Sequence, residues 1–376
     1  MGSSDGLNGQ WLGAYAGSSQ GTITVNVDER ESNYQGVAYL TNNDPKLPGT
    51  VFSFTTPNKS RKFSFRTNVI LAIDRATGNA LSLEDMAGKY PGAILPKYGD
   101  VEGSVDKDAL TLSWTTDLKT VNNCVLPRSR ADQPSELVAS EQNWGTYKER
   151  LSLDLPKRYL FRGQNGSWRL RTSFHRCGRA DLHRFIDQDI KALHRQLSAR
   201  TKHIFNLTIG DENGAFLNLV QHHGYPTPLL DWTYSPHVAA FFAYRDISNA
   251  QAAKAGPKDK VRIFVFDQAQ WRNDYNQLLQ LICPTLHVSI GEFIAIENER
   301  MIPQQAASTI TNADDIEAYI KSKETATKKY LWAIDLPVSE RKQVVSELSY
   351  MGITAGSMFP GLDGACEELK ERNFVT

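Results

Sequence analysis

The sequence has few cysteines, no excess of charge of either sign and no long apolar run. Its four cysteines lie far apart and form no C-x-x-C pair. That spacing fits neither a disulfide framework nor a zinc site. The chain has no run of about 18 apolar residues, and its first ten residues lack the basic-then-apolar order of a signal peptide. We therefore expect a cytoplasmic protein without a membrane-spanning helix.

The charge of the chain is balanced, with 42 Lys and Arg against 42 Asp and Glu. A dedicated nucleic-acid binder usually has a basic excess, so the balance argues against that class, although it excludes no local basic patch. Apolar residues make up 40% of the chain, which favours packed cores over disorder. At roughly 100–200 residues per domain, a chain of 376 residues is expected to form two domains.

The first third of the chain has the pattern of an all-β domain. Residues 7–116 contain alternating apolar and polar runs, which turn clusters such as Asn42-Asn43-Asp44-Pro45 separate. Short strands at near-regular spacing predict a sandwich or a small barrel. Such a domain could bind a protein partner or enclose a small ligand, and the sequence leaves both open.

The pattern changes twice after this β-rich region. Residues 117–140 have the composition of a linker and show no periodicity, so we expect them to be poorly ordered. Residues 141–376 mix helical spacing, as over about 180–200, with short β-branched and aromatic runs such as 261–266, which predicts a buried strand. The expected fold class is therefore α+β, with an N-terminal β domain, a linker and an α+β domain.

The first candidate segment for chemistry is an apolar strand that ends in Arg162, Gly163 and Gln164. A planar guanidinium can bind a phosphate or a carboxylate, and a neighbouring glycine lets a ligand approach the backbone. The alternative interpretation is a structural ion pair of Arg162 at a strand–loop junction.

The second candidate segment, 221–236, is predicted to contain a helix end, a turn, a short strand over 229–233 and a new helix. Ser235 is suited to cap that helix, with Pro236 at its first position. Adjacent histidines cannot easily share one metal ion, so we expect no metal site. In the alternative interpretation these residues only satisfy turn and core positions. The candidate residues at this corner are His222, His223, Asp231, Trp232, Thr233 and Ser235.

The third candidate segment, 293–305, is predicted to be a strand that ends in Glu297 and Glu299. Residues at i and i+2 share one face of a strand, so the two carboxylates could together stabilise a cationic transition state. The alternative interpretation is a pair of exposed glutamates without a role in chemistry.

These segments resemble the FRG domain family, which is named for its Phe-Arg-Gly motif. The resemblance extends over about 141–376, and two positions depart from the family pattern: Pro228 stands where Arg is usual, and Ala306 where Gly is usual. The residues that carry the resemblance are Phe161-Arg162-Gly163-Gln164, Gln221-His222-His223-Gly224, the stretch 227–236, and the late element from Arg300 to Gln305.

The order of an arginine, a Thr/Ser strand and a Glu-x-Glu step is also similar to ADP-ribosyltransferases. That resemblance implies an ADP-ribosyltransferase-like fold with NAD as a substrate. It implies that Arg162 holds the NAD phosphates and that Glu299, or its neighbour Glu297, is the catalytic carboxylate, with Asp231 as a further candidate. The other residues expected to contact NAD are Gly163, Gln164, His222, His223, Trp232, Thr233, Ser235 and Gln304.

The resemblance thus implies an NAD-dependent ADP-ribosyltransferase or NAD glycohydrolase, as a toxin or an antiphage defence effector, with nucleic acid as one possible acceptor. A second hypothesis is a non-catalytic module that binds a nucleotide or phosphate, with a protein partner on the β domain. A third is a hydrolase or nuclease that uses His222 or His223 with Asp231 as the general base. We expect one pocket to contain Arg162, Gln164, His222, Asp231, Thr233 and Ser235.

Overall fold

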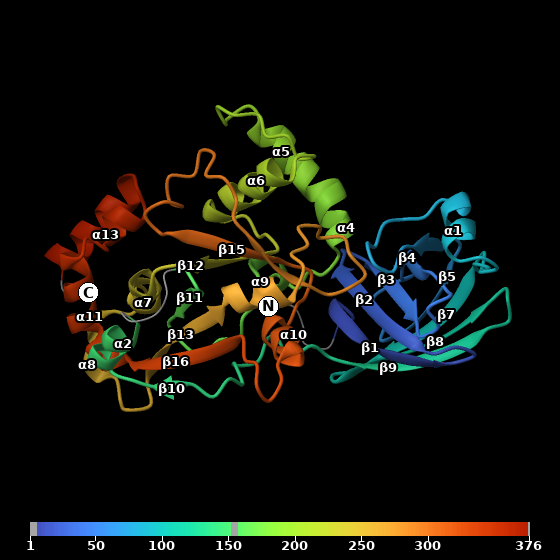
Figure 1. Cartoon of the computed structure of the whole chain (residues 1–376), viewed down its shortest axis with the longest axis horizontal. Helices are drawn as coiled ribbons and strands as arrows, with labels where there is room; N and C mark the ends of the chain where they lie inside the picture. Colours follow the sequence, from blue (N-terminus) through green and yellow to red (C-terminus); the bar gives the residue numbers. More distant parts are fainter. Residues whose placement is uncertain (1–5, 152–156, 375–376) are drawn as a thin grey trace.

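The computed structural model describes residues 6–151 and 157–374, which form two β-sheets side by side (Figure 1). The first sheet, at the right of Figure 1, is antiparallel and curls into a half-barrel. The second belongs to a mixed region of strands and helices, here called the α+β half. The predicted α+β class, with β structure first, is confirmed at this level.

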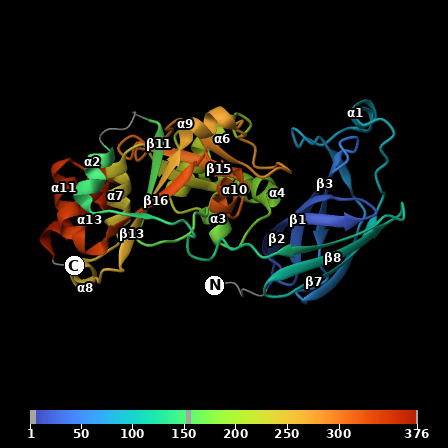
Figure 2. The same cartoon turned by 60° about the horizontal axis from the view of Figure 1, so that its bottom comes forward.

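The half-barrel has nine described strands in the order β5-β7-β8-β9-β1-β2-β3-β4-β6. Figure 2 shows these strands curving around a common interior. Phe54 of β4 stacks on Phe65 of β5 with ring centroids 4.7 Å apart, so side chains near the two ends of the curled sheet meet. The elements are β1 (Gly9–Gly17), β2 (Gly21–Glu29), β3 (Tyr34–Asn42), β4 (Gly49–Thr55), β5 (Lys62–Thr67), β6 (Leu71–Ile73), α1 (Leu83–Lys89), β7 (Gly99–Val105), β8 (Ala109–Thr116) and β9 (Val121–Pro127).

The prediction of a poorly ordered linker over 117–140 is wrong for its first half. Residues 121–127 form β9, which pairs with β8 along its length and with the end of β1. Its side chains alternate between buried and exposed, as a strand with one face on a core requires. The division of the chain into domains otherwise stays a prediction.

The second sheet has seven described strands in the order β10-β16-β13-β11-β12-β15-β14, antiparallel except between β10 and β16. The predicted strand over 261–266 is confirmed as the core of β13, every residue of which after Lys260 is buried. The strands are β10 (Ser140–Glu141), β11 (Tyr159–Gln164), β12 (Leu229–Thr233), β13 (Lys260–Asp267), β14 (Val288–Gly291), β15 (Ala306–Thr311) and β16 (Leu331–Pro337).

Helices cover both faces of the second sheet. Alternate residues of β13 point to opposite faces, so Ile263 packs with the α7 and α11 side and Phe264 packs with the α9 and α10 side. The helices are α2 (Trp144–Leu151), α3 (Ser173–Arg176), α4 (Leu182–Arg184), the π-helix η1 (Phe185–Ile190), α5 (Lys191–Leu197), α6 (Gly210–His222), α7 (Pro236–Tyr244), α8 (Asn249–Lys254), α9 (Gln268–Asp274), α10 (Ile316–Lys323), the 3₁₀-helix η2 (Val338–Glu340), α11 (Arg341–Tyr350), α12 (Ala355–Met358) and α13 (Leu362–Asn373).

Buried hydrogen bonds join the two halves. The fully buried carboxylate of Asp28, on β2, accepts from the backbone N–H groups of Ala180 and Asp181 at 2.8 and 3.1 Å. The same carboxylate accepts from Arg179 Nε at 2.7 Å and from Arg184 Nη1 at 3.3 Å. Because a buried carboxylate needs such partners, this contact fixes β2 against the start of α4.

Candidate functional site

The candidate site lies where the second sheet splits. Strands β11 and β12 pair only at Phe161 and Thr233, whereas each pairs along its whole length with its other neighbour, β13 or β15. Beyond that point the two strands separate. Arg162 crosses the gap, and its Nη1 donates to the backbone carbonyl oxygen of Asp231 at 2.7 Å. The split therefore exposes side chains of β11 and β12 to a common space.

A cavity of about 490 Å³ opens at this split, and we call it the arginine pocket. It brings together residues from β11, α3, α6, β12, α7 and the 300–306 segment. The arginine pocket is lined by Phe161, Arg162, Gly163, Gln164, Asn165, Trp168, Arg169, Arg176, Gln221, His222, Asp231, Trp232, Thr233, Phe242, Arg245, Asp246, Arg300, Gln304, Ala306 and Phe359.

Three arginines of the pocket have no acidic partner. Among the described residues, none places a carboxylate within salt-bridge distance of Arg162, Arg176 or Arg300. Arg176 and Arg300 instead donate to the backbone carbonyl oxygens of Arg171, at 2.5 Å, and His222, at 2.8 Å. These three guanidiniums outnumber the two carboxylates of the lining, Asp231 and Asp246, and so give the cavity an excess of positive charge that favours an anionic ligand.

Arg162 is the most enclosed of these three arginines. Its Nε is buried and finds no hydrogen-bond acceptor in the part of the chain that the structure describes. Burial lowers the pKa of its guanidinium to about 10; Asp231 opposes this effect and Arg176 adds to it. The guanidinium is thus charged at neutral pH, but its buried Nε lacks a hydrogen-bond acceptor. A bound anion would supply that acceptor and a compensating negative charge.

Gly163 has a different role from the one the sequence suggested. A Cβ at this position would lie 1.8 Å from the carbonyl oxygen of Ala239 and 2.7 Å from the amide nitrogen of Ala243. The absence of a side chain at Gly163 therefore lets the backbone of α7, rather than a ligand, approach β11 closely. The glycine packs helix α7 onto β11 and so sets one wall of the pocket.

Asp231 is one of two carboxylates that line the pocket, and a glutamine that was not among the candidates orients it. Gln221 Nε2 donates to Asp231 Oδ1 at 2.5 Å, and Gln221 Oε1 accepts from the Thr227 hydroxyl. Since both ends of the amide are engaged, the carboxylate is held in one direction. Gln221 is the first residue of the Gln-His-His-Gly motif, so its place in that motif could have indicated that it is a site residue.

Several other predicted residues serve backbone structure at the pocket. The Thr233 hydroxyl donates to the carbonyl of Gln304 at 2.7 Å and accepts from the backbone N–H of Ser235 at 3.0 Å. Ser235 caps α7, as predicted, and does not line the pocket. Gln304 Nε2 donates to the carbonyl of Met358 at 2.8 Å, and buried Trp232 donates to Thr309 at 3.1 Å.

The two histidines are placed differently. His222 lines the pocket and its Nδ1 is hydrogen-bonded to Asn298 Oδ1 at 2.8 Å. His223 is exposed at the end of α6 and does not line the pocket. Of the six residues expected together, the structure thus groups Arg162, Gln164, His222, Asp231 and Thr233, but not Ser235.

The prediction of a strand that ends in Glu297 and Glu299 is wrong. Strand β14 ends at Gly291, and the following segment consists of turns up to β15. Glu297 has a left-handed φ of 52°, is exposed, and accepts from the backbone N–H of His203. Neither it nor exposed Glu299 lines the arginine pocket. The left-handed backbone at Glu297 breaks the strand, and Asn298 beside it is buried and hydrogen-bonded to His222 and Asn218.

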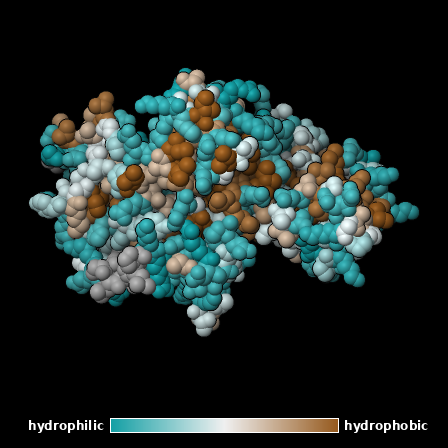
Figure 3. Space-filling model, turned by 45° about the horizontal axis from the view of Figure 1, so that its top comes forward, coloured by the Kyte–Doolittle hydropathy of each residue, from teal (hydrophilic) through white to brown (hydrophobic). Residues whose placement is uncertain are grey.

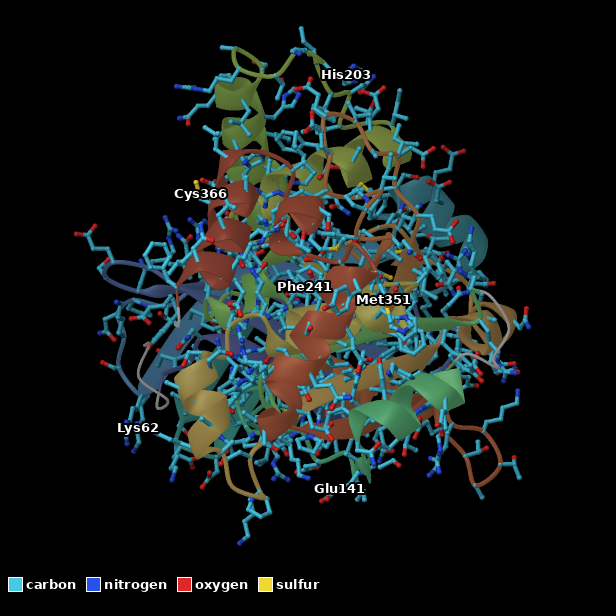
Figure 4. The ribbon with its side chains drawn as sticks, turned by 90° about the vertical axis from the view of Figure 1, so that its left-hand side faces the viewer. Lys62, Glu141, His203, Phe241, Met351 and Cys366 are labelled. Atoms are coloured by element: carbon cyan, nitrogen blue, oxygen red, sulfur yellow. The ribbon has the colours of Figure 1, made fainter. Side chains whose placement is uncertain are left out.

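Aromatic rings form the outer wall of the pocket. The Arg300 guanidinium lies 5.3 Å from the ring centroid of Phe359, and that of Arg245 lies 4.0 Å from the same ring. Figure 4 looks at this end of the molecule, with Phe241 of α7 between Cys366 and Met351. Its neighbour Phe242 packs edge-on against Phe359 with centroids 6.0 Å apart. Phe242, Arg176 and Phe359 were not among the site residues predicted from the sequence.

Within residues 6–151 and 157–374, no group of three or more His, Cys, Asp or Glu side chains could hold a metal ion. No helix in these ranges has the length and apolar character needed to cross a membrane.

Comparisons with known proteins bear on the α+β half. A search of curated proteins gave no match. One solved structure, a redesigned beta barrel, matches with 15% identity over 33% of this chain and 91% of its own, at a TM-score of 0.21, which is too low to support an argument. Residues 157–252 match the FRG domain, from just before β11 into α8, and include most of the arginine pocket. The chain is therefore an FRG domain-containing protein.

Proposed function

We propose that the arginine pocket binds a phosphorylated nucleotide, with NAD as the first candidate. The observation that carries this proposal is the set of three arginines without acidic partners, Arg162, Arg176 and Arg300. Guanidiniums bind phosphate oxygens through parallel hydrogen bonds, and the pyrophosphate of NAD offers two such groups. The aromatic rings of Trp168, Phe242 and Phe359 could stack on a base or on nicotinamide.

Removing one arginine is expected to weaken nucleotide binding. A hydrogen bond to a charged group contributes about 1.5–3 kcal/mol, so Arg176→Ala and Arg162→Ala should each weaken NAD binding by roughly 10- to 100-fold. Isothermal titration calorimetry on the whole chain measures this, with adenosine as a ligand that lacks phosphate. Arg176→Ala is the cleaner variant, because Arg162 also holds the β12 backbone.

A matched control is Arg195→Ala on α5, which removes an exposed arginine that does not line the pocket. NAD affinity should be unchanged in this variant. The proposal fails if adenosine binds as tightly as NAD, or if the Arg176 and Arg195 variants lose the same affinity.

A second candidate function is cleavage of the bound NAD, in an ADP-ribosyltransferase or NAD glycohydrolase of the kind that toxins or antiphage defence effectors use. The observation that favours it is the Asp231 carboxylate, held by Gln221 inside the arginine pocket. In this reaction the bond between ribose C1′ and nicotinamide nitrogen breaks, and its electron pair leaves with nicotinamide. A nearby carboxylate stabilises the ribosyl cation, and water or an acceptor nucleophile attacks C1′ and loses a proton.

The release of nicotinamide separates the remaining hypotheses. Release after incubation with NAD supports cleavage, and binding without release supports a recognition module. A hydrolase or nuclease built on His222 and His223 has less support, since exposed His223 lies outside the pocket and His222 is hydrogen-bonded to Asn298.

A further inference from the structure

The interior of the half-barrel contains a cavity that the FRG site does not use. Its inner part, of about 30 Å³, lies between the two walls of the curled sheet. A wider part, of about 170 Å³, opens toward one end, next to the 94–96 segment that follows α1. Both parts are lined by Leu40, Phe52, Val101 and Trp114, so they form one tapered space.

The chemistry of the lining changes along this taper. The inner part is lined only by aliphatic and aromatic side chains, among them Phe54, Phe63 and Phe65. The wider part adds hydrogen-bonding groups, which are all neutral: hydroxyls such as those of Tyr15 and Thr50, and amides such as that of Asn42. No Asp, Glu, Lys, Arg or His belongs to the described lining of either part. A charged ligand would therefore lose its hydration without gaining a counter-charge.

The size of the cavity limits the ligand. An engineered apolar cavity of about 150 Å³ binds benzene, and the wider part alone is slightly larger. The ring of Trp114 stands beside Tyr15, with centroids 5.4 Å apart, and offers an aromatic surface at the boundary between the two parts. Ile94 lines the wider part and is itself largely exposed. Figure 3 shows apolar residues on the surface of the half-barrel, at its right.

We infer that the half-barrel binds an uncharged one- or two-ring aromatic molecule, with its ring toward Trp114 and a single hydrogen-bonding group toward the mouth. The apolar rings of such a ligand would contact the aliphatic and aromatic lining, and its one neutral polar group would hydrogen-bond to the hydroxyls or amides of the wider part. This site is independent of the arginine pocket.

Titration of the whole chain with indole and 2-naphthol, each compared with benzoate, tests the inference by ligand-observed NMR. The two uncharged probes should bind and benzoate should not. In the wild-type protein, indole should show intermolecular contacts to Trp114 and Phe52. Failure of both uncharged probes to bind at millimolar concentration would overturn the site, as would equal binding of benzoate.

A bulky side chain in the wider part of the cavity should weaken this binding. Thr50 lies on β4 and lines the wider part, so Thr50→Phe should weaken probe binding at least about tenfold. The matched control is Thr55→Phe, an exposed position at the end of the same strand, which should bind the probes normally. Equal affinity of the two variants would place the probes elsewhere. If Thr50→Phe does not fold, the wild-type contacts to Trp114 alone decide.

Discussion

Replacement of Gly163 by alanine should strongly destabilise the α+β half. The new Cβ would lie 1.8 Å from the carbonyl oxygen of Ala239. Both groups belong to backbone, so no rotamer change relieves the overlap, and α7 must move away from β11. Overpacking of this kind costs at least about 3 kcal/mol, which lowers the Tm by roughly 4 °C when the whole chain melts as one unit. Thermal denaturation followed by circular dichroism measures the shift.

The control for this experiment is Gly210→Ala, at the start of α6. A Cβ there meets no atom within 4 Å. The free energy of unfolding should therefore change by no more than about 1 kcal/mol, and the Tm should shift correspondingly little. The comparison also tests the sequence-based hypothesis that Gly163 makes room for a ligand. A Gly163→Ala protein that folds normally but no longer binds NAD would support that hypothesis and contradict the packing role.

Asp231→Asn should slow the release of nicotinamide by ~10²-fold or more while NAD binds almost normally. The loss is concentrated in the transition state, because the positive charge of bound NAD lies on the pyridinium ring and develops on ribose C1′ only as the bond to nicotinamide breaks. The amide has the shape of the carboxylate and its oxygen can still accept from Gln221, so the local structure is preserved. Single-turnover kinetics with saturating NAD, together with calorimetry, separates the rate from the affinity.

Glu299→Gln is the matched control, because the sequence-based assignment gives Glu299 the same role. The structure places Glu299 outside the arginine pocket, so we expect its amide variant to turn over at the wild-type rate. A slow Glu299→Gln protein beside an unaffected Asp231→Asn protein would restore the original assignment. A wild-type chain that binds NAD without cleaving it would leave the recognition module as the function.

Features that depend on neighbours in the sequence could be predicted. The β-branched and aromatic residues of 261–266 predict a buried strand by themselves. Ser235 and Pro236 together specify where α7 begins. The grouping of Arg162 with Asp231 could also be expected, since both lie in motifs at the ends of predicted elements.

Features that depend on distant pairing could not be predicted. The split between β11 and β12 follows from which strands pair on their other sides, and no local pattern encodes that. The lack of an acidic partner for Arg300 is a property of the folded surroundings. The left-handed backbone at Glu297 lies beside a contact of Asn298 with His222, and these two residues are 76 positions apart in the sequence. Strand β9 escaped detection because its polarity does not follow its burial: Asn122 is buried, whereas Val121 and Val125 are exposed.

The buried carboxylate of Asp28 has a consequence for how the protein unfolds. It accepts from the guanidiniums of Arg179 and Arg184 and from two backbone amides of the α+β half, so separating the halves would break all four hydrogen bonds. Melting of the half-barrel is therefore coupled to melting of the FRG domain, and the whole chain should show one cooperative transition. By mass action, a molecule held in the half-barrel would then raise the melting temperature of both halves together.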